Sequence, residues 1–417
     1  MNKTKLVFSS GIAGIFEWYD YTLFGHCAII WSQQFFPSDD PHLAMLTTFA
    51  VFAAGYLMRP LGGVVFGIIG DKFGRKTALS TSIMCMALPT TLIGILPTYE
   101  VIGALATILM VLARMLQGLS MGGALTGSMS FIIEHTPPQN RGFVGSIPMS
   151  SICIGILLGS LVSSIAQWSL STENYELWGW RIPFLLGIFV IYAGLYIKRH
   201  TQETPMFTSI RTHAAIVKSP LKIVFKKYWF DMLISILINA TGSVIFYLQS
   251  IYLMNYLSLE TNINQGSINY MINISLVMMS FVTLLSGWLS DKVGRRKIYI
   301  VLNIVIMLSI FSIMDIFENG NTESMWIAQM ILSFLAAMYI GAEPALQAEF
   351  YPTSIRNTAL SLSYNTAVAL FGGTTPYIFH LLLYKTGMIT STAYYIIACS
   401  ICSLVALCFY KNRSESS

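Results

Sequence analysis

The sequence predicts an all-α membrane protein in which twelve transmembrane helices form two six-helix bundles. Three observations predict this fold class: few charges, apolar stretches of membrane-spanning length, and an internal repeat. Of the 417 residues, 55% are hydrophobic and only 10% are charged, whereas about 25% of the residues of a soluble domain are charged. A surface that faces lipid explains this deficit, because a surface that faces water would need more charge.

Apolar stretches about as long as the ~20 residues that cross a bilayer recur along the chain. The first contains Glu17 and Asp20, which the apolar core of a cleavable signal peptide would not carry, so we expect a retained span. The six cysteines lie in apolar stretches and indicate neither a metal site nor a disulfide framework. The expected spans are 6–35, 43–69, 78–97, 101–134, 143–169, 181–198, 228–256, 267–290, 297–316, 323–350, 358–384 and 391–410.

The basic residues sort to one side of these spans. Most of the 24 lysines and arginines lie near the N-terminus, in the tail and in the links that follow every second span. By the positive-inside rule that side is cytoplasmic, so we expect both termini in the cytoplasm. The same sorting explains the net charge of +5 without a nucleic-acid partner.

The internal repeat divides the chain into two halves. A long polar connection, 199–227, separates residues 1–198 from residues 228–417 and is expected to be a cytoplasmic linker. The stretch GDKFGRK after the second span returns as SDKVGRR after the eighth, and Glu-x-x-Pro-x-x-x-Arg occurs both from Glu134 and from Glu349. Two different motifs that return in the same order predict two pseudo-symmetric bundles.

The repeated loop resembles a known signature. Gly67-x-x-x-Asp71-x-x-Gly74-Arg75-Lys76 and its counterpart from Gly287 resemble the signature loop of the major facilitator superfamily. Further stretches narrow the resemblance to the metabolite:proton symporter family, which includes proline/betaine, α-ketoglutarate, citrate and shikimate permeases. These stretches are EWYDY at 17–21, RPLGG at 59–63, RMLQGLSMGG at 114–123, WGWRIPF at 178–184, ETP at 203–205, YN at 364–365 and FGGT at 371–374.

The resemblance covers nearly the whole chain and implies the major facilitator fold and a proton-coupled transporter, not an enzyme, with no cofactor. The chain departs from the family at Ala124, where relatives usually have Glu. No Gly-x-x-x-x-Gly-Lys-Ser/Thr loop for ATP occurs, so transport must draw on a gradient.

The repeated motifs predict a gate at the cytoplasmic ends of the spans. Glycine permits a tight turn and close helix approach, the aspartate can face a helix N-terminus, and the arginine can pair with Glu134 or Glu349. We expect these contacts to hold the inner side shut in the outward-open state; the alternative is a basic loop that only anchors topology. The expected gating residues are Gly67, Asp71, Gly74, Arg75, Glu134, Arg141, Asp291, Gly294, Arg295, Glu349 and Arg356.

Ionisable residues inside spans are functional candidates, because placing a charge there costs about 3 kcal/mol on insertion scales. Glu17 and Asp20 share one helix face, and Arg114 lies at a similar depth in the fourth span. We expect Arg114 to be their shared partner or the contact for a substrate carboxylate; the alternative is a static ion pair. Arg59 is interpreted as part of the cytoplasmic-end architecture. The candidate substrate or proton residues are Glu17, Asp20, Tyr21, Arg114, Gln117, Glu343, Tyr364 and Asn365.

Glu343 has two possible interpretations, a second protonatable group or a residue of the cytoplasmic vestibule.

The whole chain is expected to be a monomeric, proton-coupled importer of a small polar metabolite in the lipid bilayer of the bacterial inner membrane, working by alternating access. Arg114 favours an organic acid, citrate-like or a dicarboxylate. A zwitterionic osmolyte such as proline or betaine is the second interpretation. A proton-antiport exporter is the third interpretation. It ranks last because the fifth span lacks the Gly-Pro pair that such exporters usually carry.

Overall fold

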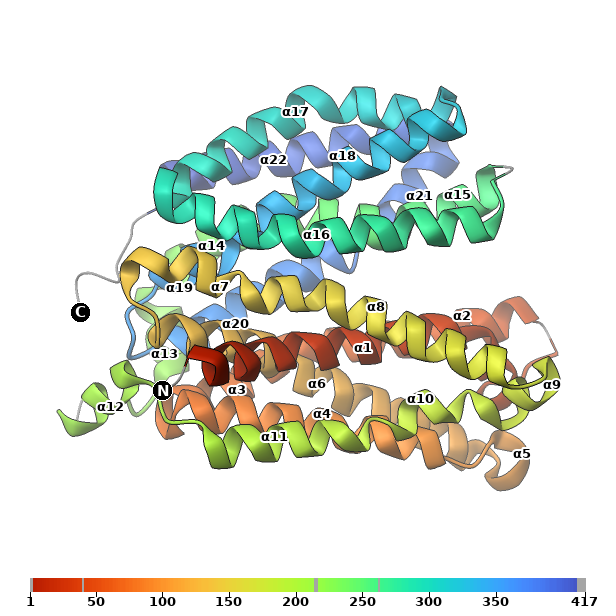
Figure 1. The fold of residues 1–417 in the computed structure, drawn as a ribbon, viewed down its shortest axis with the longest axis horizontal. Coiled ribbons are helices and arrows are strands. Elements are labelled where there is room, and N and C mark those ends of the chain that lie inside the picture. Colours follow the sequence, from red (N-terminus) through yellow and green to blue (C-terminus); the bar gives the residue numbers. More distant parts are fainter. Residues whose placement is uncertain (1–2, 40, 214–216, 262, 411–417) are drawn as a thin grey trace.

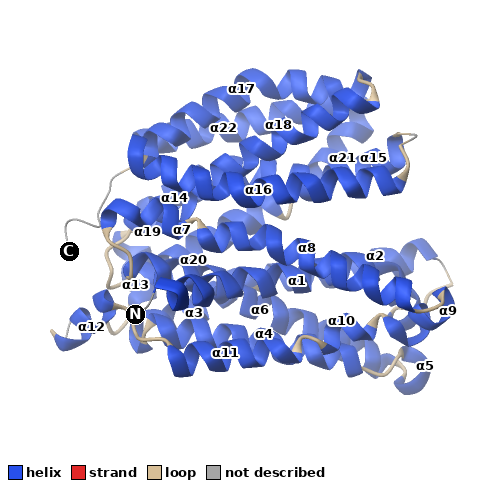
Figure 2. Cartoon of the chain, viewed as in Figure 1, coloured by secondary structure: helices blue, strands red, loops and turns tan. Residues whose placement is uncertain are grey.

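The computed structural model describes residues 3–39, 41–213, 217–261 and 263–410. Within these ranges the chain is almost entirely helical and contains no strand (Figure 2). The long helices run side by side, with the first half in the lower part of the view and the second half in the upper part (Figure 1). Helices α12 and α13 of the linker lie at the end of the molecule where α1 begins (Figure 1).

The first half contains α1 (Lys3–Phe35), α2 (Pro41–Leu57), α3 (Arg59–Phe73), α4 (Arg75–Ile95), α5 (Tyr99–Ile102), α6 (Ala104–Glu134), α7 (Arg141–Gly145), α8 (Ile147–Ser169), α9 (Thr172–Asn174), α10 (Arg181–Leu185) and α11 (Ile188–His200). The linker carries α12 (Pro205–Thr212) and α13 (Pro220–Lys227). The second half contains α14 (Trp229–Tyr247), α15 (Leu253–Glu260), α16 (Gln265–Val293), α17 (Arg295–Asn319), α18 (Thr322–Gly341), α19 (Glu343–Glu349), α20 (Arg356–Ala367), α21 (Thr375–Thr386) and α22 (Thr392–Cys408).

Eleven helical segments in the described residues are long and apolar enough to cross a membrane. Helix α1 is not among them, because Glu17 and Asp20 lie in its central part and lower its mean hydropathy. Its 33 residues would still span about 50 Å, and it packs along α8. With α1, the described residues supply the twelve spans that the sequence predicts.

Two of the spans are interrupted near their functional residues. The helix of the second span is interrupted at Met58, between α2 and α3, and that of the tenth at Ala342, between α18 and α19. A proline follows each break within the first helical turn, where its missing N–H is tolerated. The breaks place Arg59 and Glu343 at the first positions of helices inside the protein.

Glycines bring the two halves into backbone contact. A Cβ added at Gly67 of α3 would lie 2.7 Å from Cα of Thr358 on α20, and one added at Gly287 of α16 would lie 2.4 Å from the carbonyl oxygen of Gly142 on α7. No larger residue fits at either position. The first contact joins α3 to α20, and the second joins α16 to α7. The two pairs occupy equivalent positions in the halves, as the repeat in the sequence predicts.

Candidate functional site

The first buried ion pair joins α1 to α3. Arg59 Nη2 lies 2.7 Å from Glu17 Oε1, and both side chains are at most 2% exposed. Arg59 Nε also donates to Asn365 Oδ1 at 3.3 Å, on α20 of the other half. The expectation that Arg59 belongs to the cytoplasmic-end architecture is therefore wrong. It lies about 20 Å along the helices from Phe73, because the second span continues through α3.

The second buried ion pair joins α1 to α6. Arg114 Nη1 lies 3.8 Å from Asp20 Oδ2 and donates to Gln117 Oε1 at 2.7 Å. Gln117 Nε2 donates to Asp20 Oδ1 at 2.8 Å, and Thr90 Oγ1 on α4 donates to the same atom at 3.0 Å. The expected sharing of Arg114 between both carboxylates does not occur in this structure, because Arg59 takes Glu17.

Aromatic rings surround these pairs where the two halves meet. Trp18 and Tyr21 of α1 have ring centroids 4.9 Å apart, and Tyr21 lies 6.1 Å from Tyr56 of α2. Tyr56 and Tyr247 of α14 share a hydrogen bond of 2.9 Å between their hydroxyls. A cavity of about 20 Å³ opens here, lined by Tyr21, Gly55, Tyr56, Arg114, Gln117, Gly118 and Met121. The first and fourth spans thus line one cavity.

The remaining candidates come from the second half. Tyr364 on α20 is buried in the hydrophobic core. Its neighbour Asn365 donates to the carbonyl of Gly122 at 2.8 Å. Glu343 is 6% exposed, so the structure places it inside the protein.

At the cytoplasmic end, Asp71, Arg75 and Glu134 form what we call the first-half cluster. Arg75 lies 3.2 Å from Asp71 and 3.1 Å from Glu134, and all three side chains are fully buried. Gly74, between α3 and α4, has φ +107°, a conformation that favours glycine. Four contacts tie the cluster to the other half: Arg356 Nη1 lies 3.2 Å from Glu134, Arg75 donates to the carbonyl of Thr353, and Asp71 accepts from the backbone N–H groups of Asn357 and Thr358.

The linker also binds the first-half cluster. Glu203 Oε1 accepts from the backbone N–H groups of Arg75 and Lys76 at 2.9 and 3.2 Å. Thr204 Oγ1 donates to Glu134 Oε2 at 2.7 Å. The guanidinium of Arg75 lies 5.1 Å above the ring of Phe207. The stretch ETP at 203–205 belongs to the family resemblance, but these contacts could not be predicted from it.

Asp291, Arg295 and Glu349 form the second-half cluster. Arg295 lies 3.2 Å from Asp291 and 2.9 Å from Glu349. Asp291 accepts from the backbone N–H groups of Gly142 and Phe143, both at 2.8 Å.

Two other expected gating residues complete the comparison with the first-half cluster. Gly294 has φ +99°. Arg141, the counterpart of Arg356, donates to the carbonyl of Thr136 at 3.3 Å and makes no ion pair within the described residues.

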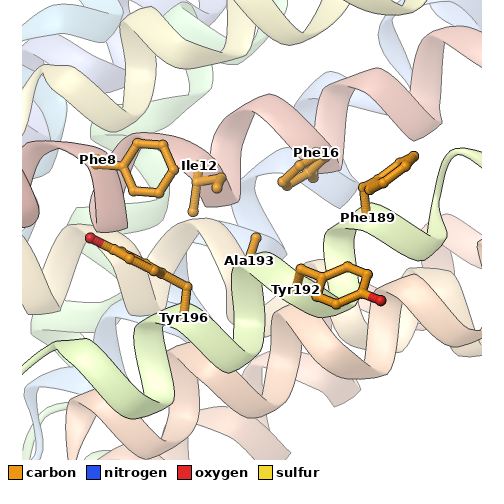
Figure 3. A pocket seen from close by; sticks show the side chains of 7 residues that line it. All are labelled: Phe8, Ile12, Phe16, Phe189, Tyr192, Ala193 and Tyr196. Atoms are coloured by element: carbon orange, nitrogen blue, oxygen red, sulfur yellow. The ribbon is translucent and has the colours of Figure 1, made fainter.

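A larger hollow lies away from these groups. A groove of about 560 Å³ runs between α1 and α11, lined by Phe8, Ile12, Phe16, Phe189, Tyr192, Ala193 and Tyr196 (Figure 3). It has no charged lining and therefore does not suit a polar substrate. In the described part of the chain no three His, Cys, Asp or Glu side chains gather as metal ligands would.

Comparisons with known families agree with this architecture. Residues 6–219 match the family described as "Sugar (and other) transporter", and residues 244–417 match "Major Facilitator Superfamily". The chain belongs to the major facilitator superfamily. The resemblance proposed from the sequence is confirmed at this level, and the family is one of transporters and not of enzymes.

The chain is similar to several curated relatives over nearly its whole length. It is 35% identical to a putative proline/betaine transporter of Staphylococcus haemolyticus, over 97% of this chain and 86% of the relative. It is 30% identical to the inner membrane metabolite transport protein YhjE of Escherichia coli, over 100% and 96%. It is 32% identical to the ectoine/proline transporter ProP of Corynebacterium glutamicum, over 97% and 83%.

Among solved structures, the chain is similar to the proton:xylose symporter XylE bound to 6-bromo-6-deoxy-D-glucose. The TM-score is 0.80 at 17% identity, with 98% of this chain and 96% of XylE covered. At this identity the likeness establishes the fold, which is the major facilitator fold predicted from the sequence.

Proposed function

We propose that this chain is a proton symporter that imports a zwitterionic osmolyte of the proline or betaine type across the bacterial inner membrane. One observation carries the proposal: two buried arginines, each paired with a carboxylate, lie beside aromatic rings between the halves.

The charge balance of this central site favours a zwitterion. Glu17 with Arg59 and Asp20 with Arg114 sum to no net charge. A substrate with one positive and one negative group can exchange with these pairs and leave the sum unchanged. A citrate-like ion brings several negative charges, and a buried excess charge is strongly unfavourable. The organic acid favoured by Arg114 alone is therefore the weaker interpretation.

The aromatic rings suit the positive end of such a substrate. Quaternary ammonium groups bind over the faces of Trp and Tyr rings, and Trp18, Tyr21, Tyr56 and Tyr247 are all close together. An arginine offers the planar donors that match a carboxylate. The names of the staphylococcal and corynebacterial relatives, a proline/betaine and an ectoine/proline transporter, support the same substrate class.

The transport cycle follows from the cytoplasmic clusters. Residues 1–198 and 228–417 act as two bundles joined by the cytoplasmic linker 199–227, and one monomer suffices. Both termini lie in the cytoplasm. The two clusters hold the inner side closed, and their release lets the bundles rock about the central site.

The test is uptake into proteoliposomes with an acidic exterior. We expect pH-driven accumulation of labelled betaine or proline, and little uptake of citrate. Arg114→Ala should abolish substrate binding, Arg114→Lys should retain weak binding, and Arg199→Ala at the exposed end of α11 should leave both unchanged. Preference for citrate would refute the substrate class, and dependence on sodium in place of pH would refute proton coupling.

The coupling role of Glu17 and Asp20 stays a prediction of the same proposal. We expect Glu17→Gln or Asp20→Asn to impair pH-driven accumulation more than substrate exchange, because exchange needs no net proton movement. Counterflow at equal pH on both sides separates the two. A double variant that still accumulates substrate against its gradient would contradict this role.

A further inference from the structure

Helix α13 of the linker presents a surface that is both basic and aromatic. Its side chains Lys222, Phe225 and Lys226 are exposed, Phe225 by 52%. They share one face of the helix, because residues three and four positions apart are neighbours. Trp229, the first residue of α14, is 55% exposed and extends the aromatic part of this face. We call these four residues the α13 surface.

The rest of the protein does not use the α13 surface. No ion pair of the described residues includes Lys222 or Lys226. The neighbouring Lys227 differs, since its Nζ lies 5.6 Å from the ring centroid of Tyr228. On the opposite face of α13, Val224 is fully buried in the hydrophobic core. One face of the helix is therefore packed, and the other carries large apolar rings and unpaired charges.

The chain enters the membrane directly after α13. The segment Trp229–Ser258 is long and apolar enough to span the bilayer, and α13 lies at the end of the molecule where α1 begins (Figure 1). Tryptophan is enriched where a span meets the membrane–water interface. Lysine can lay its apolar stem on such a boundary and keep its charge in water. The α13 surface thus suits the level of the lipid headgroups.

The charge of this part of the chain has one sign. Between residues 204 and 230 there are five basic residues and no acidic one. The cytoplasmic leaflet carries anionic phospholipids, which attract basic segments close to the membrane. The charge of the linker is complementary to that leaflet. The basic residues are Arg211, Lys218, Lys222, Lys226 and Lys227.

We propose that the α13 surface binds the headgroups of anionic phospholipids in the cytoplasmic leaflet. The two lysines contact the lipid phosphates, and the rings of Phe225 and Trp229 enter the boundary between the headgroups and the acyl chains, as in other interfacial helices. This inference uses the proposed orientation, with the linker in the cytoplasm. It depends neither on the substrate nor on the coupling ion.

Lipid bound at the α13 surface stabilises the closed inner side. Helix α13 packs against both α3 and α20. These helices of opposite halves are joined by Asp71, which accepts from the backbone N–H groups of Asn357 and Thr358. Helix α13 can keep both neighbours only while the two halves are together. A ligand that binds the folded, closed arrangement raises its stability by mass action.

The experiment is thermal unfolding of the full-length protein in a neutral detergent, titrated with dioleoylphosphatidylglycerol or with dioleoylphosphatidylcholine. We expect the anionic lipid to raise the melting temperature, the neutral lipid to leave it unchanged, and added potassium chloride to weaken the response. The double variant Lys222→Gln/Lys226→Gln should need about 25-fold more anionic lipid for half of the shift, about fivefold for each lysine. Phe225→Ser should weaken the response a few-fold.

A matched control removes the same charge elsewhere. Arg296 and Lys297 are exposed at the start of α17, and Arg296→Gln/Lys297→Gln should respond to the anionic lipid within twofold of wild type. Lys222→Arg/Lys226→Arg keeps the charge of the α13 surface and should also respond as wild type.

Three results would overturn the inference. An equal response of the wild-type protein to the neutral lipid would show that charge is not recognised. An unchanged response of Lys222→Gln/Lys226→Gln would place the lipid elsewhere. An equal loss in Arg296→Gln/Lys297→Gln would show that the overall charge attracts the lipid, and not the α13 surface. None of these measurements uses transport, so their outcome is separate from that of the proposed symport.

Discussion

The first-half and second-half clusters repeat the same Asp–Arg–Glu contacts in different surroundings. The first-half cluster is fully buried, receives Arg356 from the other half and is covered by the linker. In the second-half cluster the side chains are 6–13% exposed. Its counterpart of Arg356, Arg141, makes no ion pair within the described residues and donates to a nearby carbonyl of its own half.

The comparison shows which contacts both copies of the repeat make and which contacts occur at the first-half cluster alone. The shared part is the glycine turn, the Asp–Arg–Glu contacts and the aspartate at a helix N-terminus of the opposite half. Among the described residues, the contacts found only at the first-half cluster are the ion pair of Arg356 with Glu134 and the hydrogen bonds of the linker residues Glu203 and Thr204. We therefore expect the first-half cluster to contribute more to closing the inner side, although the motifs alone would assign equal weight to both.

The largest expected difference is between Glu134→Gln and Glu349→Gln. Glu134 balances two buried arginines, Arg75 and Arg356, and its loss should lower the free energy of unfolding by about 3–5 kcal/mol. Glu349 pairs with the partly exposed Arg295, and its loss should lower it by about 1 kcal/mol. Thermal unfolding in one detergent measures both variants. Equal shifts in melting temperature would show that the two clusters are equivalent.

A smaller difference is expected between Asp71→Asn and Asp291→Asn. Each aspartate accepts two backbone N–H groups of the opposite half, an interaction at a helix N-terminus that contributes up to about 2 kcal/mol. Asp71 is the more buried. We expect transport to fall about tenfold for Asp71→Asn and a few-fold for Asp291→Asn.

Substrate affinity should change little in either aspartate variant, because both residues are remote from the central site. Initial uptake rates and equilibrium binding of betaine, measured on the same preparations, separate the two effects. Equal loss of binding and transport in Asp71→Asn would show that the cluster acts on folding or on the central site.

Much of the fold could be predicted from the sequence, because spans and repeats are one-dimensional patterns. Gly67 and Gly74 are clear cases, since the spacing of the signature loop indicates both the close helix contact and the turn. Arg59 could not be placed in this way. The expected span 43–69 already contains Arg59, but the sequence does not show that its side chain meets Glu17 of α1 and Asn365 of α20.

The proposed substrate class rests on ion pairs that the sequence alone does not show. Arg114 considered alone offers a positive charge and favours an organic acid. Only the three-dimensional structure gives each buried arginine its own carboxylate and makes the central site neutral. The contacts of Glu203 and Thr204 could not be predicted for a similar reason, because the sequence of a polar linker does not show which helices it packs against.

The glycines between the paired helices provide a matched test of the linker. Gly74→Ala and Gly294→Ala share the strain of a positive φ combined with an extended ψ, about 1–3 kcal/mol. A Cβ at residue 74 would also lie 2.0 Å from Glu203 Oε2, whereas one at residue 294 meets nothing within 4 Å. We expect Gly74→Ala to lower the melting temperature more than Gly294→Ala. Equal shifts would mean that Glu203 moves away without loss.

The smallest expected effect isolates the hydrogen bond from Thr204 of the linker to Glu134. Thr204 Oγ1 donates to Glu134 and also accepts from the N–H of Phe207 as the N-cap of α12. Thr204→Val therefore loses a cap, about 1 kcal/mol, together with the bond to Glu134. A double-mutant cycle with Glu134→Gln removes the cap from the comparison, because the cap is lost in both backgrounds. We expect a coupling free energy of about 0.5–1.5 kcal/mol between the two positions. A value of zero would show that the Thr204 hydroxyl does not stabilise Glu134, and the advantage of the first-half cluster would then rest on Arg356 and on the hydrogen bonds of Glu203.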